Sequence, residues 1–499
     1  MDINERNEDN PLPEEPSSDP VDGAPQAAAG VPEPLIEGAP QAADVPSADN
    51  TQTIVEPATA PSGETEGGAP RRRKSRIRED IEAVILAIIF VVVIRQYVAE
   101  AYKIPTGSME PTLMGDSEPG RGDGDNIIVD KMYYWYNPVA RWDVVVFKRP
   151  NEEADSRGGA ADGRERAVLD TRNFIKRCIG LPGETIQIKH GDVYITNNAG
   201  LDGEIPQKPA EAQEALWQRV YFCDFTAAYP FSGGKQRWDI TNMARISFRG
   251  GKMVADAGPT SGVLLELQQI LDYRIGDNNE EIEKDKGAYG KNCVGDIMIE
   301  TSATFGDADS SLTLEIVEDD CLYTASLGPG GSAISWRLGD AQAVKEKVNF
   351  DFSAGVEYKI RFINVDDRLR LMVNGKPAWG EHHFAKGEVP ISDGGSTAAA
   401  ARIRILNGKM TLSSLNIYRD VYYTDAPGNN ATKGPYHVPE ECYFALGDNS
   451  PISSDSRVWG TFSRQDLIGK ACFVFFPFHP VFDIEKKRLE WKSRMKLIR

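Results

Sequence analysis

One unbroken apolar run limits how this chain can fold more than any other feature. Residues 84–94 carry no charge, and six Lys or Arg residues precede them within residues 71–78. A helix needs about 20 residues to cross the hydrocarbon core of a bilayer. The stretch 77–98 is long enough when Glu82 and Arg95 lie near the two interfaces, where long charged side chains can reach water. The sequence therefore predicts one transmembrane helix.

The basic flank of this run predicts its orientation. A buried core helix and a cleaved signal peptide are alternative readings, but neither accounts for the cluster of positive charge, which collects on the cytoplasmic side of membranes. We expect residues 1–78 in the cytoplasm and the chain beyond about residue 98 on the far, extracytoplasmic side of the membrane. The apolar run 471–478 is too short to cross back and contains a proline. It favours a strand, or a surface patch resting on lipid.

Composition separates the first 70 residues from the rest. They hold 15 Asp or Glu and one basic residue, which accounts for 14 of the 19 net negative charges. They are also rich in Pro and Ala, and cannot bury enough apolar area to offset chain entropy, so we predict a disordered cytoplasmic tail. The remainder lacks the basic footprint of a nucleic-acid-binding protein.

Cysteine and histidine usage argues against a metal centre. The six cysteines have no CxxC spacing, and the chain has only five histidines, so a zinc site is not expected. Because the bulk of the chain is expected outside the cytoplasm, one or two disulfides could form. The first pair to test is Cys293–Cys321.

Beyond the helix the pattern is that of β-structure. Residues 126–130 and 143–147 are short β-branched runs, and 184–195 looks like a hairpin turning at residues 190–192. Between 215 and 422, apolar and polar residues alternate with the period of two that is typical of sheets with one buried face. A segment of this length and pattern predicts a β-sandwich.

Within this segment, one stretch resembles a known kind of sandwich. Residues 365–376, which end in the hairpin turn signal Asn374-Gly375, resemble a strand pair of concanavalin-like, jelly-roll lectin domains. The resemblance implies a lectin-like insert with a glycan or a protein as partner. Four tryptophans of the segment are expected to pack in its core rather than stack on sugars, namely Trp217, Trp238, Trp336 and Trp379.

Ser108 and Lys176 are the candidate reactive pair. Serine becomes a nucleophile only when a base removes its proton. Lysine can act as that base only when neutral, and roughly one lysine in two thousand is neutral at pH 7 unless burial lowers its pKa. Lys176 lies in the apolar, strand-like run 174–181, and Ser108 follows a glycine just beyond the membrane helix. Taken singly, Lys176 could equally be an ordinary solvated lysine, and Ser108 would more often be a turn serine, because Gly-Ser pairs are common.

Four segments, taken together, favour a reactive pair over a solvated lysine and a turn serine. They are residues 104–113, 141–147, 174–184 and 445–460. In type and order they resemble bacterial type I signal peptidases, the membrane-anchored serine–lysine proteases. The resemblance implies removal of signal peptides from secretory preproteins through an acyl-enzyme, without a metal or cofactor. Ser450-Pro451-Ile452 departs from the Arg-Asp-Asn that the family more often has.

The resemblance also implies roles for individual positions. Ser108 would be the nucleophile and Lys176 the general base. Thr106 and the backbone N–H of Ser108 would form the oxyanion hole, while Ser453 would hydrogen-bond and orient the lysine. The remaining matches are a supporting pair, Asp455 and Arg457, and the walls of a substrate pocket for small side chains, Ile104, Pro105 and Ile175.

The predicted fold class is mainly β, with a signal-peptidase-type core behind one transmembrane helix and an inserted jelly-roll sandwich. The expected boundaries are a tail at 1–70, the basic flank and helix at 71–98, the N-terminal half of the catalytic core at 99–214, the insert at 215–422, and the C-terminal half of the core with a basic tail at 423–499. Two other functions stay open: a relative of self-cleaving repressors or pilus-maturation proteases, and a membrane-tethered glycan-binding or adhesion protein.

Overall fold

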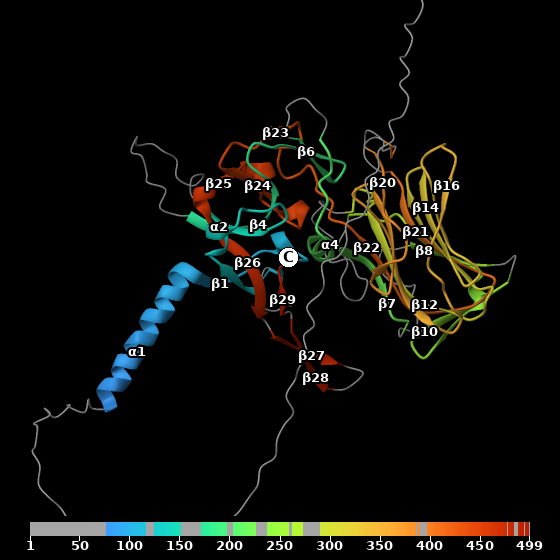
Figure 1. The fold of residues 1–499 in the computed structure, drawn as a ribbon, viewed down its shortest axis with the longest axis horizontal. Coiled ribbons are helices and arrows are strands. Elements are labelled where there is room, and N and C mark those ends of the chain that lie inside the picture. The colour runs from blue at the N-terminus through green and yellow to red at the C-terminus, as the bar shows by residue number, and fades with distance from the viewer. Residues whose placement is uncertain are drawn as a thin grey trace, which may run out of the picture. The chain divides into compact units, whose positions relative to one another are not determined.

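The computed structural model contains one long helix and several antiparallel sheets (Figure 1). It describes residues 76–115, 124–150, 171–196, 203–225, 237–258, 262–272, 290–385, 388–389, 397–476, 478–483, 488–493 and 495–498. The predicted disordered tail and the start of the basic flank lie outside these residues.

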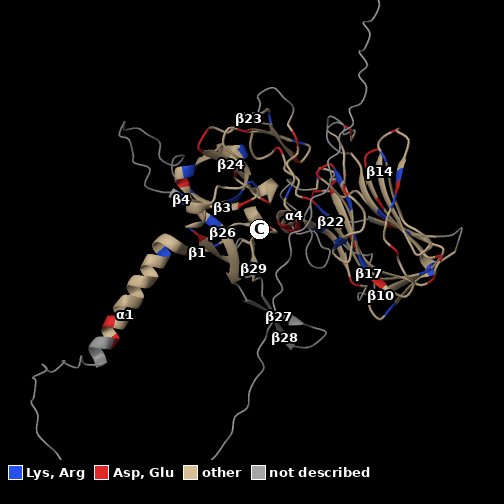
Figure 2. Ribbon diagram, in the orientation of Figure 1, with Lys and Arg blue, Asp and Glu red and all other residues tan. Residues whose placement is uncertain are grey.

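The apolar run forms the helix α1, Arg76–Val93, which continues as a π-helical turn, Ile94–Val98. The stretch Asp80–Val98 is long and apolar enough to cross a membrane, and none of it is buried against the rest of the protein. Figure 2 shows charged residues near its two ends and none between them. A helix that is apolar on all sides and packs against nothing is typical of a membrane span.

The first sheet after the helix is built from both halves of the chain. Its strand order is β1-β2-β26-β3-β4-β24-β25, with β29 paired to β26. These strands are Ala99–Lys103, Asn126–Asp130, Leu467–Phe476, Val144–Pro150, Thr171–Gly180, Cys442–Leu446, Phe462–Ser463 and Lys496–Leu497. Because β4 pairs with β24, segments on either side of the predicted insert lie next to each other. The apolar run near residue 475 is therefore a strand, as one of its two readings predicted.

Smaller elements surround this sheet. Two further sheets contain β23 (Tyr436–His437), β5 (Thr185–Lys189) and β6 (Asp192–Thr196), and β27 (Phe478–Asp483) with β28 (Arg488–Ser493). The predicted hairpin is confirmed: β5 and β6 join through His190 and Gly191, both with positive φ. The short helices are α2 (Tyr133–Tyr136), α4 (Ala210–Leu216) and α5 (Ser456–Trp459), with 3-10 turns at Gly107–Met109, Ser450–Ile452 and Arg464–Asp466. A further 3-10 turn, Met243–Arg245, lies in the inserted segment.

Two sheets between Gln218 and Arg419 form the predicted sandwich. One has the order β19-β18-β17-β12-β22-β10-β9, with β20 and β7 paired to β18 and β22. Its strands are Lys376–Pro377, Arg368–Val373, Glu357–Val365, Ile297–Phe305, Gly408–Arg419, Lys252–Ala257, Ile246–Arg249, His382–His383 and Gln218–Cys223. The other has the order β16-β15-β14-β13-β21-β11-β8, with strands Val344–Lys347, Ala333–Arg337, Cys321–Leu327, Ser311–Glu318, Ala399–Leu406, Val263–Gln268 and Arg237–Thr241.

Alternate residues of both sheets fill one apolar core. Leu314 and Ile316 of β13 and Ile360 and Phe362 of β17 are fully buried members of the same cluster. The four tryptophans pack as expected, because each is buried or partly buried in an apolar cluster of the sandwich. The fold class is thus confirmed as mainly β, with a sandwich between the two halves of the first sheet.

The predicted disulfide is wrong. All six cysteines are free thiols, including Cys293 and Cys321. Their backbones pair with different partners: Cys321 opens β14 opposite Glu318, whereas Cys293 forms an isolated β-bridge with Leu271. The sequence showed that two cysteines were 28 positions apart but not which neighbours each would meet.

Candidate active site

Ser108 lies on a tight turn that is held from behind by a distant loop. It sits in the 3-10 turn Gly107–Met109 and is 7% exposed. The backbone N–H of Asn449 donates to the Ser108 carbonyl over 3.1 Å, and the Asn449 side chain donates to the Gly107 carbonyl over 2.9 Å. Gly447 permits this approach, because a Cβ there would lie 2.4 Å from the Ser108 carbonyl oxygen. The loop after β24 therefore fixes the serine backbone.

Lys176 meets this serine from the middle of β4. Its side chain is buried, and Nζ lies 2.7 Å from Ser108 Oγ and 3.0 Å from the Ile175 carbonyl oxygen. Strand β4 is held in register by β3, where Val145 pairs with Lys176. The structure thus brings together the two residues of the predicted dyad, which are 68 positions apart, at hydrogen-bond distance.

The surroundings of Lys176 disfavour its charged form. Burial lowers the pKa of the lysine from its ordinary value to about 8, while Asp455 and Asp448 oppose that shift and Arg457 adds to it. With a pKa of about 8, roughly one Lys176 in ten is neutral at pH 7, against about one in several thousand for a solvated lysine. The amine is therefore suited to accept a proton.

The Thr106 side chain lies close to the Ser108 hydroxyl group. Its Oγ1 lies 3.5 Å from Ser108 Oγ, a long contact, and the residue is exposed. An exposed hydroxyl next to a buried serine can point toward an incoming carbonyl group. The position fits the predicted oxyanion-hole residue, whose role stays a prediction.

The predicted hydrogen bond from Ser453 to the lysine does not form. Ser453 is completely buried, yet its Oγ has no hydrogen-bond partner among the described residues. Lys176 Nζ instead contacts Ser108 and the Ile175 carbonyl group. The expectation came from the position of Ser453 in a motif, and the side-chain torsion that decides the contact cannot be derived from such a match.

Asp455 and Arg457 form the predicted pair, and the pair lies in the interior of the protein. Both are fully buried, with Nη2 of the arginine 2.7 Å from Oδ2 of the aspartate. Asp455 also accepts the backbone N–H groups of Gly447 and Arg457, and so caps α5. Arg457 donates to Thr424 and Ser450 as well. A fully satisfied charge network of this kind is rigid.

A second buried ion pair, Arg177–Asp448, was missed by sequence reasoning. Arg177 donates to both carboxylate oxygens of Asp448 at 2.8 and 2.7 Å, and both side chains are fully buried. Asp448 lies beside Asn449, which holds the Ser108 turn. One signal was available: an arginine directly after a lysine in an apolar strand requires a buried partner.

The expected pocket walls are only partly brought together. Ile104 is buried and Ile175 is half-buried, and both belong to the apolar cluster that includes Met109, next to the serine. Pro105 is exposed. Branched apolar walls beside a nucleophile suit a small side chain of a substrate, and the pocket assignment stays a prediction.

Comparison with known protein families agrees with this geometry. A family described as signal peptidase, peptidase S26, matches residues 77–229 and 366–476, just over half of the chain. The two matched segments contain the serine turn, β4 and the loop after β24. The chain therefore belongs to the signal peptidase family, peptidase S26.

Individual relatives are similar over a shorter stretch of the chain. The signal peptidase I of Leptolyngbya laminosa is 36% identical over 139 residues, which is 28% of this chain and 59% of the relative. That of Bacillus licheniformis is 28% identical over 141 residues, 28% of this chain and 62% of the relative. The signal peptidase I of Mycobacterium tuberculosis is 31% identical over 160 residues, which is 28% of this chain and 53% of the relative. The chain thus spans between half and two thirds of the length of these relatives.

Solved structures similar to this chain include carbohydrate-active enzymes. The endo-beta-1,3(4)-glucanase SCLam has a TM-score of 0.29 at 10% identity, covering 48% of this chain and 97% of its own. The laminarinase from Rhodothermus marinus has a TM-score of 0.29 at 10% identity, and the match covers 41% of this chain and 98% of the laminarinase.

Proposed function

We propose that this protein is a signal peptidase that removes N-terminal signal peptides from exported preproteins with a serine–lysine dyad. The observation that carries the proposal is the buried 2.7 Å contact between Lys176 Nζ and Ser108 Oγ. Membership of peptidase S26 supports the same activity. These two side chains suffice to move the proton from the serine hydroxyl group to the leaving amine.

The reaction would proceed in two halves. Ser108 Oγ attacks the carbonyl carbon of the scissile peptide bond while neutral Lys176 takes its proton. The resulting ammonium group then protonates the leaving amine, and the acyl-enzyme forms. A water molecule that gives its proton to the same lysine attacks the ester, and protonation of Ser108 Oγ releases the acid.

In the transition state, negative charge develops on the carbonyl oxygen of the substrate. Hydrogen-bond donors that are already in position stabilise this charge. The Ser108 N–H and the Thr106 hydroxyl group are the candidates, and loss of one such donor typically costs about 3–4 kcal/mol of transition-state stabilisation. The turn that carries both is held by Asn449 from behind. Ile104, Pro105 and Ile175 would receive the small side chains that precede the cleavage site.

The location of the protein belongs to the proposal. Helix α1 would cross the inner membrane once, with the acidic tail in the cytoplasm and the catalytic core on the extracytoplasmic face. The six basic residues within residues 71–78, before and at the start of α1, support this orientation. Emergence of preproteins at that face would bring their signal peptides to Ser108. The sandwich would then be exposed to the same compartment, where a glycan or a protein could bind it.

The direct test is cleavage of a preprotein by the purified full chain in detergent or nanodiscs. Ser108→Ala and Lys176→Ala should each lower the rate at least about a thousandfold, because either change removes nucleophile activation. Lys189→Ala, at an exposed position of β5, is the matched control and should leave the rate unchanged. Circular dichroism must show that each variant is folded. Processing that survives either dyad substitution would remove the assignment.

A further inference from the structure

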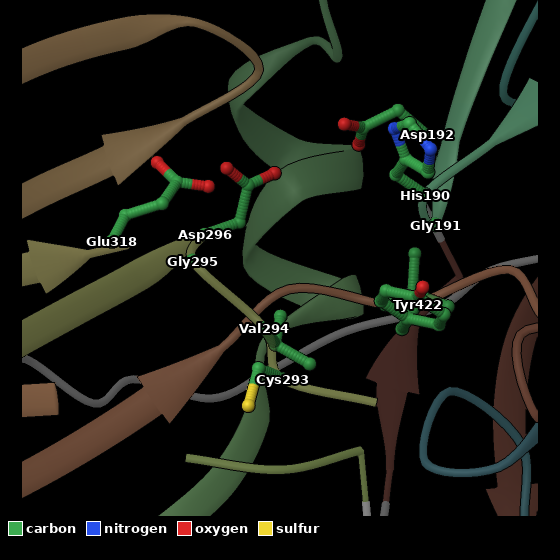
Figure 3. A pocket seen from close by; sticks show the side chains of 10 residues that line it. His190, Gly191, Asp192, Cys293, Val294, Gly295, Asp296, Glu318 and Tyr422 are labelled. Carbon is green, nitrogen blue, oxygen red and sulfur yellow. The ribbon is translucent and has the colours of Figure 1, made fainter. Parts of the chain in front are cut away.

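The catalytic core and the sandwich meet over a polar junction. At one part of it, the β5–β6 hairpin faces the sandwich across a cavity of about 20 Å³, and Figure 3 shows the Asp192 and Asp296 side chains pointing toward each other across it. A second part is the segment 207–218, which comes after β6, contains α4 and enters the sandwich at β7. This connecting segment has no role in the proposed reaction, yet it contacts the surroundings of Lys176.

Arg177, the residue after Lys176, donates hydrogen bonds to three different parts of the core. It donates to both carboxylate oxygens of Asp448 and, over 2.8 Å, to the Trp142 carbonyl group. Over a longer 3.4 Å it also donates to the Thr112 hydroxyl group. These three acceptors belong to the loop after β24, the residues before β3 and the segment after the serine turn.

Each of these three acceptor residues also contacts the connecting segment. The hydrogen bonds are Gln218 Nε2 to the Asp448 carbonyl oxygen over 3.3 Å, Trp142 Nε1 to the Gln207 carbonyl oxygen over 3.2 Å, and Thr112 Oγ1 to the Ala215 carbonyl oxygen over 3.3 Å. The residues that surround Arg177 in the core are therefore held on their other side by the segment that leads into the sandwich.

The backbone of Trp142 shows that one of these contacts is kept despite strain. Trp142 has a φ of 76°, in the left-handed region that a bulky side chain rarely adopts, and it is 5% exposed. Such a conformation persists only where the surrounding structure holds it. Here the Trp142 N–H donates to the Cys178 carbonyl group, its carbonyl group accepts from Arg177, and its indole N–H donates to Gln207.

Gln218 is the side chain of the connecting segment that reaches the catalytic loop itself. It is 8% exposed, and its Oε1 accepts a hydrogen bond from Nη2 of Arg419 over 2.7 Å. Arg419 is buried at the end of β22 and also donates to the carbonyl groups of Asp420 and Asp272. Because its oxygen is held by the arginine, the Gln218 amide turns its nitrogen toward Asp448.

The Gln218 hydrogen bond and the hydrogen bond to the nucleophile lie on the same peptide group. Gln218 donates to the carbonyl oxygen of Asp448, and the N–H of that same peptide unit, which belongs to Asn449, donates to the Ser108 carbonyl oxygen over 3.1 Å. A peptide group is planar and moves as one unit. A rotation that carried the carbonyl oxygen away from Gln218 would therefore also carry the N–H away from Ser108.

We propose that Gln218 is a positioning residue of the active site, which keeps the Ser108 turn in place by holding the Asp448–Asn449 peptide group. The inference rests on the proposed function, because it concerns the same serine. The sandwich would then supply a side chain that arranges the nucleophile, in addition to being joined to the core.

The first test compares kcat and KM for preprotein cleavage by the full chain and by Gln218→Met, which has a similar length and no donor. We expect kcat to fall about tenfold and KM to change less than about twofold, because the nucleophile is displaced and substrate binding is not. The pH at which kcat/KM levels off should stay at about 8, because Lys176 remains buried. A change that merely loosened the core would hydrate the lysine and move this pH upward.

Gln213→Met is the matched control. Gln213 is buried in the same segment, but its Nε2 donates to Asp420 Oδ1 and not to the catalytic loop, so this variant should keep the wild-type kcat. Gln218→Glu keeps an acceptor for Arg419 and turns an oxygen toward the Asp448 carbonyl group, so it should lower kcat at least as much as Gln218→Met. The proposal is overturned if Gln218→Met keeps the wild-type kcat, or if Gln213→Met lowers kcat equally.

Hydrogen exchange, followed by mass spectrometry of the segment 445–453, gives a readout that does not depend on catalysis. The Asn449 amide should exchange at least about fivefold faster in Gln218→Met than in the wild type, and at the wild-type rate in Gln213→Met. Faster exchange in a chain that cleaves no preprotein would contradict the proposed function and support the positioning role. Unchanged exchange in a chain that cleaves preproteins would contradict the positioning role alone.

Discussion

At the scale of single residues, the candidate site depends on one amine whose pKa is lowered to about 8 by burial. Lys176 was identifiable because a lysine in an apolar strand is unusual, and Ser108 because it follows the membrane helix. Their neighbours were harder to predict. Whether Asp448 pairs with Arg177 or with Lys176 decides whether the amine is neutral, and only the structure assigns it to Arg177.

The proposed base determines the pH dependence of the reaction. Because Lys176 must be neutral and its pKa is about 8, kcat/KM should rise about tenfold per pH unit from about pH 6 and level off above about pH 8. The measurement is cleavage of a quenched fluorescent peptide across this pH range and up to about pH 10, with folding checked at each pH. A plateau that begins below about pH 7, or a rise that continues to about pH 10, would contradict the assignment.

The lowered pKa of Lys176 also predicts that replacing this lysine stabilises the folded protein at pH 7, whereas most core substitutions destabilise it. The folded-state pKa of Lys176 lies below the unfolded value, so the cost of burying the amine is fully present below about pH 8 and disappears as the pH rises to about 10.5. Relative to the wild type, Lys176→Met should gain about 3 kcal/mol more stability at pH 7 than at about pH 10.5. Urea unfolding at the two pH values measures this difference; an equal gain at both would show that the lysine is not desolvated.

At the scale of elements, strands and turns followed from local patterns. The period-two alternation predicted the sandwich strands, and Asn374-Gly375 predicted a hairpin turn that has positive φ at both residues. The pairing of strands could not be predicted from local patterns. Strand β4 pairs with β24, more than 250 positions later, and no local pattern distinguishes that partner from a nearer strand.

The turn at Gly375 offers a clean test of backbone strain. Gly375 has a φ of 76° and open space around its Cα, so Gly375→Ala meets no atom and should cost about 1 kcal/mol from conformation alone. Gly380 also has open space but no positive φ, and Gly380→Ala should change stability by less than about 0.5 kcal/mol. Thermal unfolding of both variants measures the contrast. Equal effects would mean that the turn does not require glycine.

At the scale of the whole molecule, buried polar contacts join the core to the sandwich. Gln218 of β7 donates to the Asp448 carbonyl group over 3.3 Å, next to the loop that holds Ser108. Lys208, between β6 and α4, contacts Asp366 and Asp420 at the ends of sandwich strands. The insert is therefore connected to the catalytic core by buried polar contacts, one of which reaches the loop that holds Ser108.

Lys208 is the residue whose loss should disturb this junction most. Lys208→Met leaves the buried Asp420 without its cation and leaves Asp366 with Arg368 alone, so it should cost about 3–5 kcal/mol of stability. Lys345→Met, on the exposed strand β16, is the matched control and should cost less than about 0.5 kcal/mol. Urea unfolding followed by tryptophan fluorescence measures both. A loss below about 1 kcal/mol for Lys208→Met would show that the junction is not held by this cation.

The amino-acid sequence by itself determined the long apolar helix, the β-rich fold class, the family resemblance and the choice of Ser108 and Lys176 as the candidate dyad. Each follows from apolar length, period-two alternation or short motifs, which are properties of neighbouring residues. Only the tertiary structure decided that the cysteines stay apart, that Ser453 Oγ lacks a partner among the described residues, that Arg177 takes Asp448, and that Gln218 reaches the Asp448 carbonyl group. Those outcomes depend on which distant strands pair and on how deeply each charge is buried, and both are set by contacts between segments far apart in the chain.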